Sequence, residues 1–543
     1  MLAEDLLRNG ASRHDRPVVR APIVTVPRIL ALLSLCLILA CLPVLVTATP
    51  PMVDYLNHLG RAHILANWHH NELFQKVFVL DSLLLPNVLS DIVLAALSGW
   101  IGALAAGQVV LLLILILTVV GAFALNAAAT KQLSTWPLLV ALFLYNEFFF
   151  WGFLNYLLGI AILLWGCAAW LLLEPQSRRG QLAAMASFAL LILFSHLVAF
   201  GLFAVAIAIL EMEAAWHRRQ EGTRKILVRM AGAAMAFAPA LLLYLVTSPT
   251  RNLPLALQYD QHDLLFNKLS SFTRILSSGD TALDLVILGG AVLIVLVAFL
   301  RRSVSLEPGL AAVAAAFALL VLLMPHEAMG SFLLDKRIAV PSVILFLAAL
   351  RPRNGHGHLG ALGVAAVLIL LALRSGGLML DWQATGRDYA AIITGIRHLP
   401  EGGLVIPVSS WPAPDPPTWF RTTTRAPSKR EHVAIYATIL RGSVVPTIFA
   451  RRGQNPIVLE PSSEALDAVG WGKMALGVEG NNALSNLLPK VAAQASAIRR
   501  TDPVFATRTI HLLLLSVTCD RWQATVPIAP SYCGDDFAIV EIK

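Results

Sequence analysis

Charged residues are scarce in this chain of 543 residues: they make up 14% of it, whereas 57% is hydrophobic. A soluble domain carries about 25% charged residues, so the deficit argues against an ordinary soluble protein. Residues 29–48 and residues 109–129 contain no charged residue at all. Each run has roughly the 20 apolar residues that a helix needs to cross the hydrocarbon core of a bilayer. We therefore predict a protein with several membrane-spanning helices.

Three common signatures of enzyme active sites are also missing. The sequence has no Gly-x-x-x-x-Gly-Lys-Ser/Thr phosphate loop, no Gly-x-Ser-x-Gly nucleophile elbow and no His-Glu-x-x-His zinc helix. ATP-driven transport and zinc-dependent proteolysis are therefore not expected of this chain.

Cysteine is rare, with five residues in the whole chain. Cys36, Cys41 and Cys167 lie in apolar runs, where a small hydrophobic side chain is a sufficient explanation. Cys519 and Cys533 lie near each other in the C-terminal region. A disulfide between them is expected if that region faces an oxidising compartment, and two free thiols are the alternative.

Basic residues gather in short patches between the apolar runs, after every second run. This positive-inside pattern places the patches and the N-terminus in the cytoplasm. The net charge of +8 therefore reflects membrane topology, and no nucleic-acid partner is expected. The patches comprise Arg8, Arg13, Arg16, Arg20 and Arg28; Arg178 and Arg179; Arg218, Arg219, Arg224, Lys225 and Arg229; Arg301 and Arg302; and Arg351 and Arg353.

The apolar runs and their flanking charges predict a mainly α fold, a polytopic transmembrane helical bundle of about 11 spans. We expect a cytoplasmic segment at 1–28, a transmembrane domain at 29–380 with an outer loop at 49–90, and a separate domain at 381–543. Residues 91–106 contain glycines that favour a re-entrant or interfacial helix. An odd number of spans places the last domain outside the cytoplasm, in the periplasm if the bilayer is a bacterial inner membrane.

Composition changes sharply in this last domain. Residues 411–417 are rich in proline, and the runs 403–407, 511–516 and 537–542 have the short apolar character of strands. Alternating helical and strand periods of this kind predict a small α/β domain.

Asp54 follows the first predicted span by only a few residues. If it begins a helix, His58 at i+4 and Arg61 at i+7 lie on the same face. A carboxylate can act as general base toward an acceptor hydroxyl, and an arginine can hold a phosphate leaving group. The alternative is that Asp54 caps an interfacial helix whose solvated side carries the other two residues.

Three more ionisable residues are expected on the outer side. Glu147 interrupts an aromatic, apolar region, where an unpaired acid is costly. The positive-inside rule disfavours basic residues on the outer side, where Lys336 and Arg337 are expected. Their presence there suggests an anionic partner such as a lipid phosphate or diphosphate. Pairing of both cations with Asp335 is the alternative. His196, in a tight turn between two spans, is expected to be satisfied by local backbone.

This layout resembles the membrane-embedded glycosyltransferases of the GT-C superfamily, which includes protein O-mannosyltransferases, oligosaccharyltransferases and aminoarabinose transferases. The resemblance rests on Asp54 in the first outer loop, the helix expected at 55–68, the span count and the terminal domain. It implies that the chain transfers a sugar from a polyprenyl-phosphate donor to an acceptor outside the cytoplasm. It also implies that Asp54 is the catalytic residue.

One departure from these families concerns metal. Many of them carry a paired carboxylate at this place, whereas Asp54 is followed by Tyr55. A single carboxylate is a poor site for a divalent ion, so we expect a reaction without metal or other cofactor. His58, Arg61, Glu147, Lys336 and Arg337 are predicted to bind substrate. Two rival functions remain: a lipid-linked saccharide transporter or flippase, and a non-catalytic membrane subunit of a polysaccharide assembly system.

Overall fold

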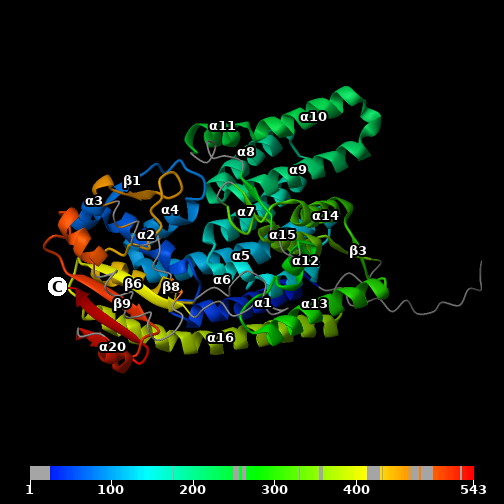
Figure 1. The fold of residues 1–543 in the computed structure, drawn as a ribbon. Coiled ribbons are helices and arrows are strands. Elements are labelled where there is room, and N and C mark those ends of the chain that lie inside the picture. Colours follow the sequence, from blue (N-terminus) through cyan, green and yellow to red (C-terminus); the bar gives the residue numbers. More distant parts are fainter. Residues whose placement is uncertain are drawn as a thin grey trace, which may run out of the picture.

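Helices dominate the structure, a computed structural model shown in Figure 1. It describes residues 25–174, 176–248, 256–259, 264–328, 331–353, 359–411, 429–430, 432–463, 466, 476–477, 493–525 and 529–542. Within these residues, seven helical segments are long and apolar enough to cross a membrane. They are α1 (Val26–Val46), α5 (Ala103–Thr130), α7 (Leu154–Leu173), α9 (Leu197–His217), α10 with α11 (Thr223–Ala236 and Ala238–Thr247), α13 (Thr281–Leu300) and α16 (Ala361–Arg397). The chain is a multi-pass membrane protein.

Shorter helices complete the bundle. They are α4 (Leu89–Ile101), η2 with α6 (Trp136–Phe143 and Glu147–Trp151), α8 (Arg178–Ser195), α14 (Pro308–Leu323) and α15 (Leu334–Ala348). Strands β3 (Val304–Leu306) and β5 (Leu350–Pro352), of three residues each, pair antiparallel although α14 and α15 separate them in the chain. The predicted total of about 11 spans stays a prediction, because none of these helices is both long and apolar enough to count as a span by length and composition.

Local sequence explains where several helices end. Gly102 has φ +79°, a conformation that favours glycine, and it separates α4 from α5. Pro239 lies in the first turn of α11, where a proline fits, and a helix break precedes it at Phe237. His196 forms the tight turn between α8 and α9. The re-entrant or interfacial helix expected at 91–106 is α4 with the start of α5.

The loop after α1 is helical and bonded to the C-terminal region. It contains α2 (Tyr55–Asn67), η1 (Trp68–His70), α3 (Glu72–Val77) and β1 (Phe78–Leu80). Strand β1 pairs antiparallel with β7 (Ile457–Leu459). On the same side, α12 (Leu264–Thr273) precedes α13, and β2 (Leu257–Gln258) pairs with β4 (Glu327–Ala328). Two loops of the membrane bundle therefore acquire strand partners far away in sequence.

The C-terminal residues form a five-stranded sheet in the order β10-β11-β9-β6-β8. Central strands β6 (Leu404–Trp411) and β9 (Ile510–Leu515) run parallel, and β11 (Phe537–Ile542) is antiparallel to β9. All six residues of β9 are buried, as expected of a strand covered on both faces. The remaining elements are η5 (Val433–Ile435), α17 (Tyr436–Arg441), η6 (Pro461–Ser463), β8 (Leu476–Gly477), α20 (Cys519–Thr525) and β10 (Tyr532–Cys533).

A single long helix connects the bundle to this sheet. Helix α16 packs beside α1 and α13 and then reaches the sheet, so the predicted boundary at residue 381 falls inside a helix (Figure 1). Its last turns pack so closely on the sheet that a Cβ on Gly395 would lie 2.8 Å from the Tyr532 ring. The predicted fold class, a mainly α transmembrane bundle with a C-terminal α/β region, is confirmed. The proline-rich run 412–417 lies outside the described residues.

Cys519 and Cys533 are joined in a disulfide, with their Cα atoms 5.8 Å apart. The bond ties α20 to edge strand β10. Cys36, Cys41 and Cys167 are buried free cysteines.

Candidate functional site

Asp54 stands immediately before α2, at the helix N-terminus. Its side chain makes no capping hydrogen bond to the helix, so the capping alternative does not describe it. The Asp54 side chain is 18% exposed. The carboxylate is therefore within reach of a substrate and is not committed to holding the helix end.

The backbone of Asp54 is held by the end of α6. The Asp54 N–H donates to the Trp151 carbonyl and the Val53 N–H to the Phe150 carbonyl, both at 3.0 Å. Gly152 follows with φ +78°, and a Cβ there would lie 2.7 Å from the Tyr55 backbone nitrogen. Only glycine permits this approach, so the aromatic segment around α6 serves to position Asp54.

Arg61 and His58 face Asp91 of α4, not Asp54. The Arg61 Nε and Nη2 atoms donate to Asp91 Oδ1 at 3.0 and 2.6 Å, and His58 Nδ1 lies 3.3 Å from the same oxygen. Burial raises the pKa of the Asp91 carboxyl, but the charges of Arg61 and His58 outweigh it and hold that pKa below its usual range. Arg61 is 1% exposed and Asp91 is 0% exposed, so this triad is buried and joins α2 to α4. The sequence analysis placed His58 and Arg61 on a common face correctly but missed their partner.

Arg337, in the first turn of α15, has a different environment. Asp335 is paired with Lys268 at 2.6 Å and with His326 at 3.2 Å, so the predicted alternative of an Asp335–Arg337 pair is wrong. Arg337 is 8% exposed, and its guanidinium lies 4.5 Å over the Phe153 ring. Among the described residues, no carboxylate lies within ion-pairing distance of it, and its Nε atom has no hydrogen-bond partner. Within the described part of the chain, this buried cation therefore has no counterion in contact.

Two neighbours hold the Arg337 side chain and backbone. Its Nη1 atom lies 3.1 Å from His196 Nε2, and Tyr156 donates its hydroxyl to the Arg337 carbonyl. His196 Nδ1 also accepts from the Val198 N–H at 3.2 Å, which confirms the expected bond to local backbone. The contact with Arg337 was not expected from the sequence.

Two acids and several cations lie near one another at this end of the bundle. The charges of Asp54 and Arg337 are close enough to affect each other without an ion pair in contact, and the charges of Lys336 and Arg274 affect Glu147. Glu147 begins α6, the helix whose end holds Asp54, and its N–H donates to the Ile275 carbonyl at 3.0 Å. Lys336 is 6% exposed.

A histidine from the C-terminal region completes the cluster. His432 Nε2 lies 3.5 Å from Asp54 Oδ1, and its side chain is 5% exposed. The sequence analysis did not single out His432, because it follows a proline-rich stretch and carries no motif. We refer to Asp54, Glu147, Lys336, Arg337 and His432 as the candidate site.

No group of three or more His, Cys, Asp or Glu side chains able to hold a metal ion occurs among the described residues. Asp54 remains a single carboxylate with cationic and imidazole neighbours. The expectation of metal-independent chemistry stays a prediction.

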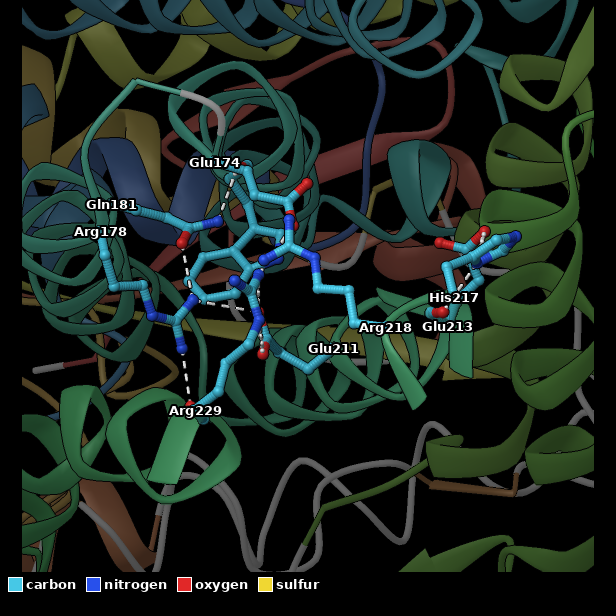
Figure 2. A network of polar contacts seen from close by, with 9 residues as sticks. Glu174, Arg178, Gln181, Glu211, Glu213, His217, Arg218 and Arg229 are labelled. Atoms are coloured by element: carbon cyan, nitrogen blue, oxygen red, sulfur yellow. Dashed lines mark hydrogen bonds and ion pairs between the residues drawn. The ribbon is translucent and has the colours of Figure 1, made fainter. Parts of the chain in front are cut away.

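A second polar network lies at the other end of the same helices (Figure 2). Arg229 binds Glu211 at 3.0 Å and Glu174 at 2.7 Å. Arg178 also contacts Glu211, at 3.1 Å, and Arg218 contacts Glu174, at 2.8 Å. Helix α7 begins at the candidate site and ends here, about 30 Å away at 1.5 Å per residue. Because each arginine has a carboxylate, this network joins α7, α8, α9 and α10 and differs in kind from the candidate site.

No protein-family model matches the sequence, and no curated protein matches it at a significant level.

Solved structures support the fold assignment. The crystal structure of ArnT from Cupriavidus metallidurans in the apo state aligns with a TM-score of 0.50 and 12% identity, over 95% of this chain and 98% of that chain. The crystal structure of ArnT from the same organism bound to undecaprenyl phosphate covers the same shares, with a TM-score of 0.48 and 11% identity. Identity this low establishes the fold alone, and we rest it on the apo structure.

Proposed function

We propose that this chain is a membrane glycosyltransferase that transfers a sugar from a polyprenyl-phosphate donor to an acceptor on the periplasmic side of a bacterial inner membrane. The observation that carries the proposal is the Arg337 guanidinium, buried without a carboxylate in contact and close enough to Asp54 to interact with its charge. The likeness of the fold to the GT-C class supports it.

A buried cation without a counterion is costly, by several kcal/mol. A phosphate group that arrives beside Arg337 supplies the missing negative charge, and its oxygens accept two parallel N–H bonds from the guanidinium. Lys336, the residue before Arg337 in α15, adds a second positive charge at the same end of the bundle. A lipid-linked phosphate reaches such a site from the bilayer.

The reaction needs one base and one stabilised leaving group. The acceptor hydroxyl oxygen attacks the anomeric carbon of the donor sugar, and the bond from that carbon to the phosphate oxygen breaks. Asp54 takes the hydroxyl proton, and the polyprenyl phosphate leaves with one additional negative charge. Arg337 and Lys336 stabilise that charge as preorganised cations. Glu147 accepts hydrogen bonds from sugar hydroxyls.

Arg61 and His58 have a supporting role in this proposal. Their pairing with buried Asp91 leaves them no access to a phosphate. They hold the start of α2 against α4, and the phosphate-binding role predicted for Arg61 passes to Arg337. A metal ion has no assigned place in the reaction, so added EDTA should leave the rate unchanged.

The orientation of the chain in the membrane follows from charge and from the disulfide. Arg178, Arg218 and Arg229 gather around Glu174 and Glu211, at the end of α7 that is remote from the candidate site, where the positive-inside rule places the cytoplasm. The Cys519–Cys533 disulfide suits an oxidising periplasm.

A transfer assay tests the proposal. The purified chain is incubated in liposomes with radiolabelled sugars linked to polyprenyl phosphate, and label that leaves the lipid is counted. We expect transfer by the wild type and a loss of at least about 100-fold in Asp54→Asn, since a general base contributes 100-fold to 10,000-fold. The matched control is Glu72→Gln, in the same loop with its side chain 85% exposed, which should transfer normally.

Two outcomes contradict the proposal. Transfer by Asp54→Asn at the wild-type rate removes Asp54 from the mechanism. Binding of undecaprenyl phosphate without transfer of any sugar by the wild type favours a flippase or a non-catalytic subunit.

A further inference from the structure

We infer that His432 of the C-terminal region is a positioning residue for Asp54, held in the required tautomer by Asn57. The inference rests on the proposed role of Asp54 as the base. It assigns the C-terminal region a part in the catalytic centre, beyond the recognition of an acceptor.

The amide of Asn57 has one possible orientation. Its Oδ1 atom accepts from the Phe449 N–H at 2.7 Å, and its Nδ2 atom donates to the Thr447 carbonyl at 2.7 Å. Both partners are backbone groups, which cannot exchange the roles of donor and acceptor. Asn57 is also fully buried, at 0% exposure. Its amide nitrogen is therefore a fixed donor.

This fixed donor determines which nitrogen of the His432 imidazole carries the proton. Asn57 Nδ2 lies 3.3 Å from His432 Nδ1, so Nδ1 must accept and the ring proton is on Nε2. Nε2 is the atom that faces Asp54 Oδ1, at 3.5 Å. The Phe449 ring packs edge-on against the imidazole, with centroids 5.3 Å apart. The ring thus presents an N–H to one carboxylate oxygen at slightly more than hydrogen-bond length.

The His432 Nε2–H that faces Oδ1 affects how the Asp54 carboxylate is oriented. The contact favours one rotamer of the carboxylate and leaves Oδ2 to receive the acceptor proton. Contacts of this kind are often long before substrate binds and shorten in the reactive complex. His432 therefore orients the base without taking the proton.

The surrounding packing makes this contact depend on the whole C-terminal region. Helix α2 packs against η5 and α17, and a Cβ on Gly60 would lie 2.3 Å from the Ile435 side chain. Thr447 and Phe449, which orient Asn57, also come from the C-terminal region. Asp54 is therefore in its working orientation only when this region is seated on α2.

Three substitutions of His432 separate positioning from packing. In His432→Gln the side-chain amide nitrogen reaches the place of Nε2, whereas in His432→Asn it reaches only the place of Nδ1. We expect His432→Ala and His432→Asn to lose about 100-fold in kcat, the cost of a misplaced catalytic group, with the donor KM unchanged. His432→Gln should recover most of the rate. The control is His398→Ala, an exposed histidine of the same region, which should behave as wild type.

The opposite order of activities among the His432 variants overturns the inference. If His432 only packs against Asn57, then His432→Asn keeps more activity than His432→Gln, and losses follow thermal stability.

A structural measurement decides the role of His432 without reference to activity. Cryo-electron microscopy of the wild type and of His432→Ala and His432→Asn should show the Asp54 carboxylate rotated in both variants, with Arg337 in place. An unchanged Asp54 rotamer in a folded variant refutes the inference. If the wild type transfers no sugar, the proposed function fails, and the Asp54 rotamer still decides whether His432 positions it.

Discussion

Asp54 and Arg337 carry opposite charges and interact with each other, yet they do not form an ion pair in contact. Different elements hold the two residues. The end of α6 bonds the Asp54 backbone and His432 lies beside its carboxylate, whereas Phe153 and His196 contact the Arg337 side chain. Because neither charge is neutralised by the other, both remain able to act on a third group. A sugar phosphate that lies between a base and a cation needs this separation.

The Arg337 side chain should not be replaceable by lysine. Lysine keeps the charge but loses the forked donors and the flat surface that stacks on Phe153. We expect Arg337→Lys to raise the donor KM about 10-fold to 100-fold, the worth of one or two hydrogen bonds to a charged group. Arg337→Gln should be worse.

Transfer rates measured at increasing concentrations of the sugar donor give the donor KM of each variant. Arg397→Lys, at an exposed position of α16, is the matched control and should keep the wild-type KM. An unchanged donor KM in Arg337→Gln would show that the phosphate binds elsewhere.

At the scale of elements, α2 is positioned by three neighbours. The end of α6 bonds the backbone of Asp54, α4 supplies Asp91 to the Arg61 side chain, and the C-terminal region covers Gly60. A change in any of these neighbours should therefore reach Asp54 through α2.

Gly152→Ala tests the contact between α6 and α2. Alanine at φ +78° is strained by about 1–3 kcal/mol, and its Cβ would lie 2.7 Å from the Tyr55 nitrogen. We expect Gly152→Ala to have a lower melting temperature than the wild type. Its kcat should also fall, and by more than in the control variant Gly99→Ala, because the start of α2 must move. Gly99→Ala in α4, where nothing lies within 4 Å, should be neutral or slightly stabilising. Full activity in a folded Gly152→Ala protein would contradict this role of α6.

Asp91→Asn tests the contact between α4 and α2. It leaves the buried Arg61 charge uncompensated, which costs about 3–5 kcal/mol. Replacement of both partners, Arg61→Met with Asp91→Leu, should recover much of that stability because no buried charge remains. Thermal unfolding in detergent measures both variants. Equal stability of Asp91→Asn and wild type would mean that water reaches the pair.

At the scale of the whole molecule, the two ends of the bundle differ in electrostatics. One end has a buried, unpaired arginine beside a carboxylate, and the other has arginines paired in a network (Figure 2). The C-terminal sheet lies at the same end of the bundle as α2 (Figure 1), and strand β7 of the C-terminal region pairs with β1 of the first loop. Chemistry is therefore expected on one side of the membrane only.

Cysteine labelling tests this polarity in intact cells. Exposed Glu72 begins α3, and exposed Arg219 lies in the connection between α9 and α10, which is at the opposite end of the molecule from α3 (Figure 1). A membrane-impermeant maleimide should label Glu72→Cys in intact cells and Arg219→Cys only after lysis. The native cysteines are buried or in a disulfide and give little background. The reverse labelling pattern would place the candidate site in the cytoplasm.

The sequence by itself determined the membrane helices and most of their ends, because the length of an apolar run and the residues that break it are local properties. Residues 109–129, for example, were expected to cross the membrane and lie in α5 (Ala103–Thr130). The run 537–542 was expected as a strand and is β11. The importance of Asp54, Glu147, Lys336 and Arg337 was also inferred locally, from charges at places where charge is costly, although their roles stay predictions.

Only the tertiary structure decided which of these charges are already paired. Asp91 neutralises Arg61 from another helix, and Lys268 takes Asp335 away from Arg337. His432 reaches Asp54 from beyond the last membrane helix. Helical and strand periods report which face of an element is apolar, but they carry no information on which distant side chain meets that face. Partners of buried charges are set by packing, and packing is a property of the folded chain.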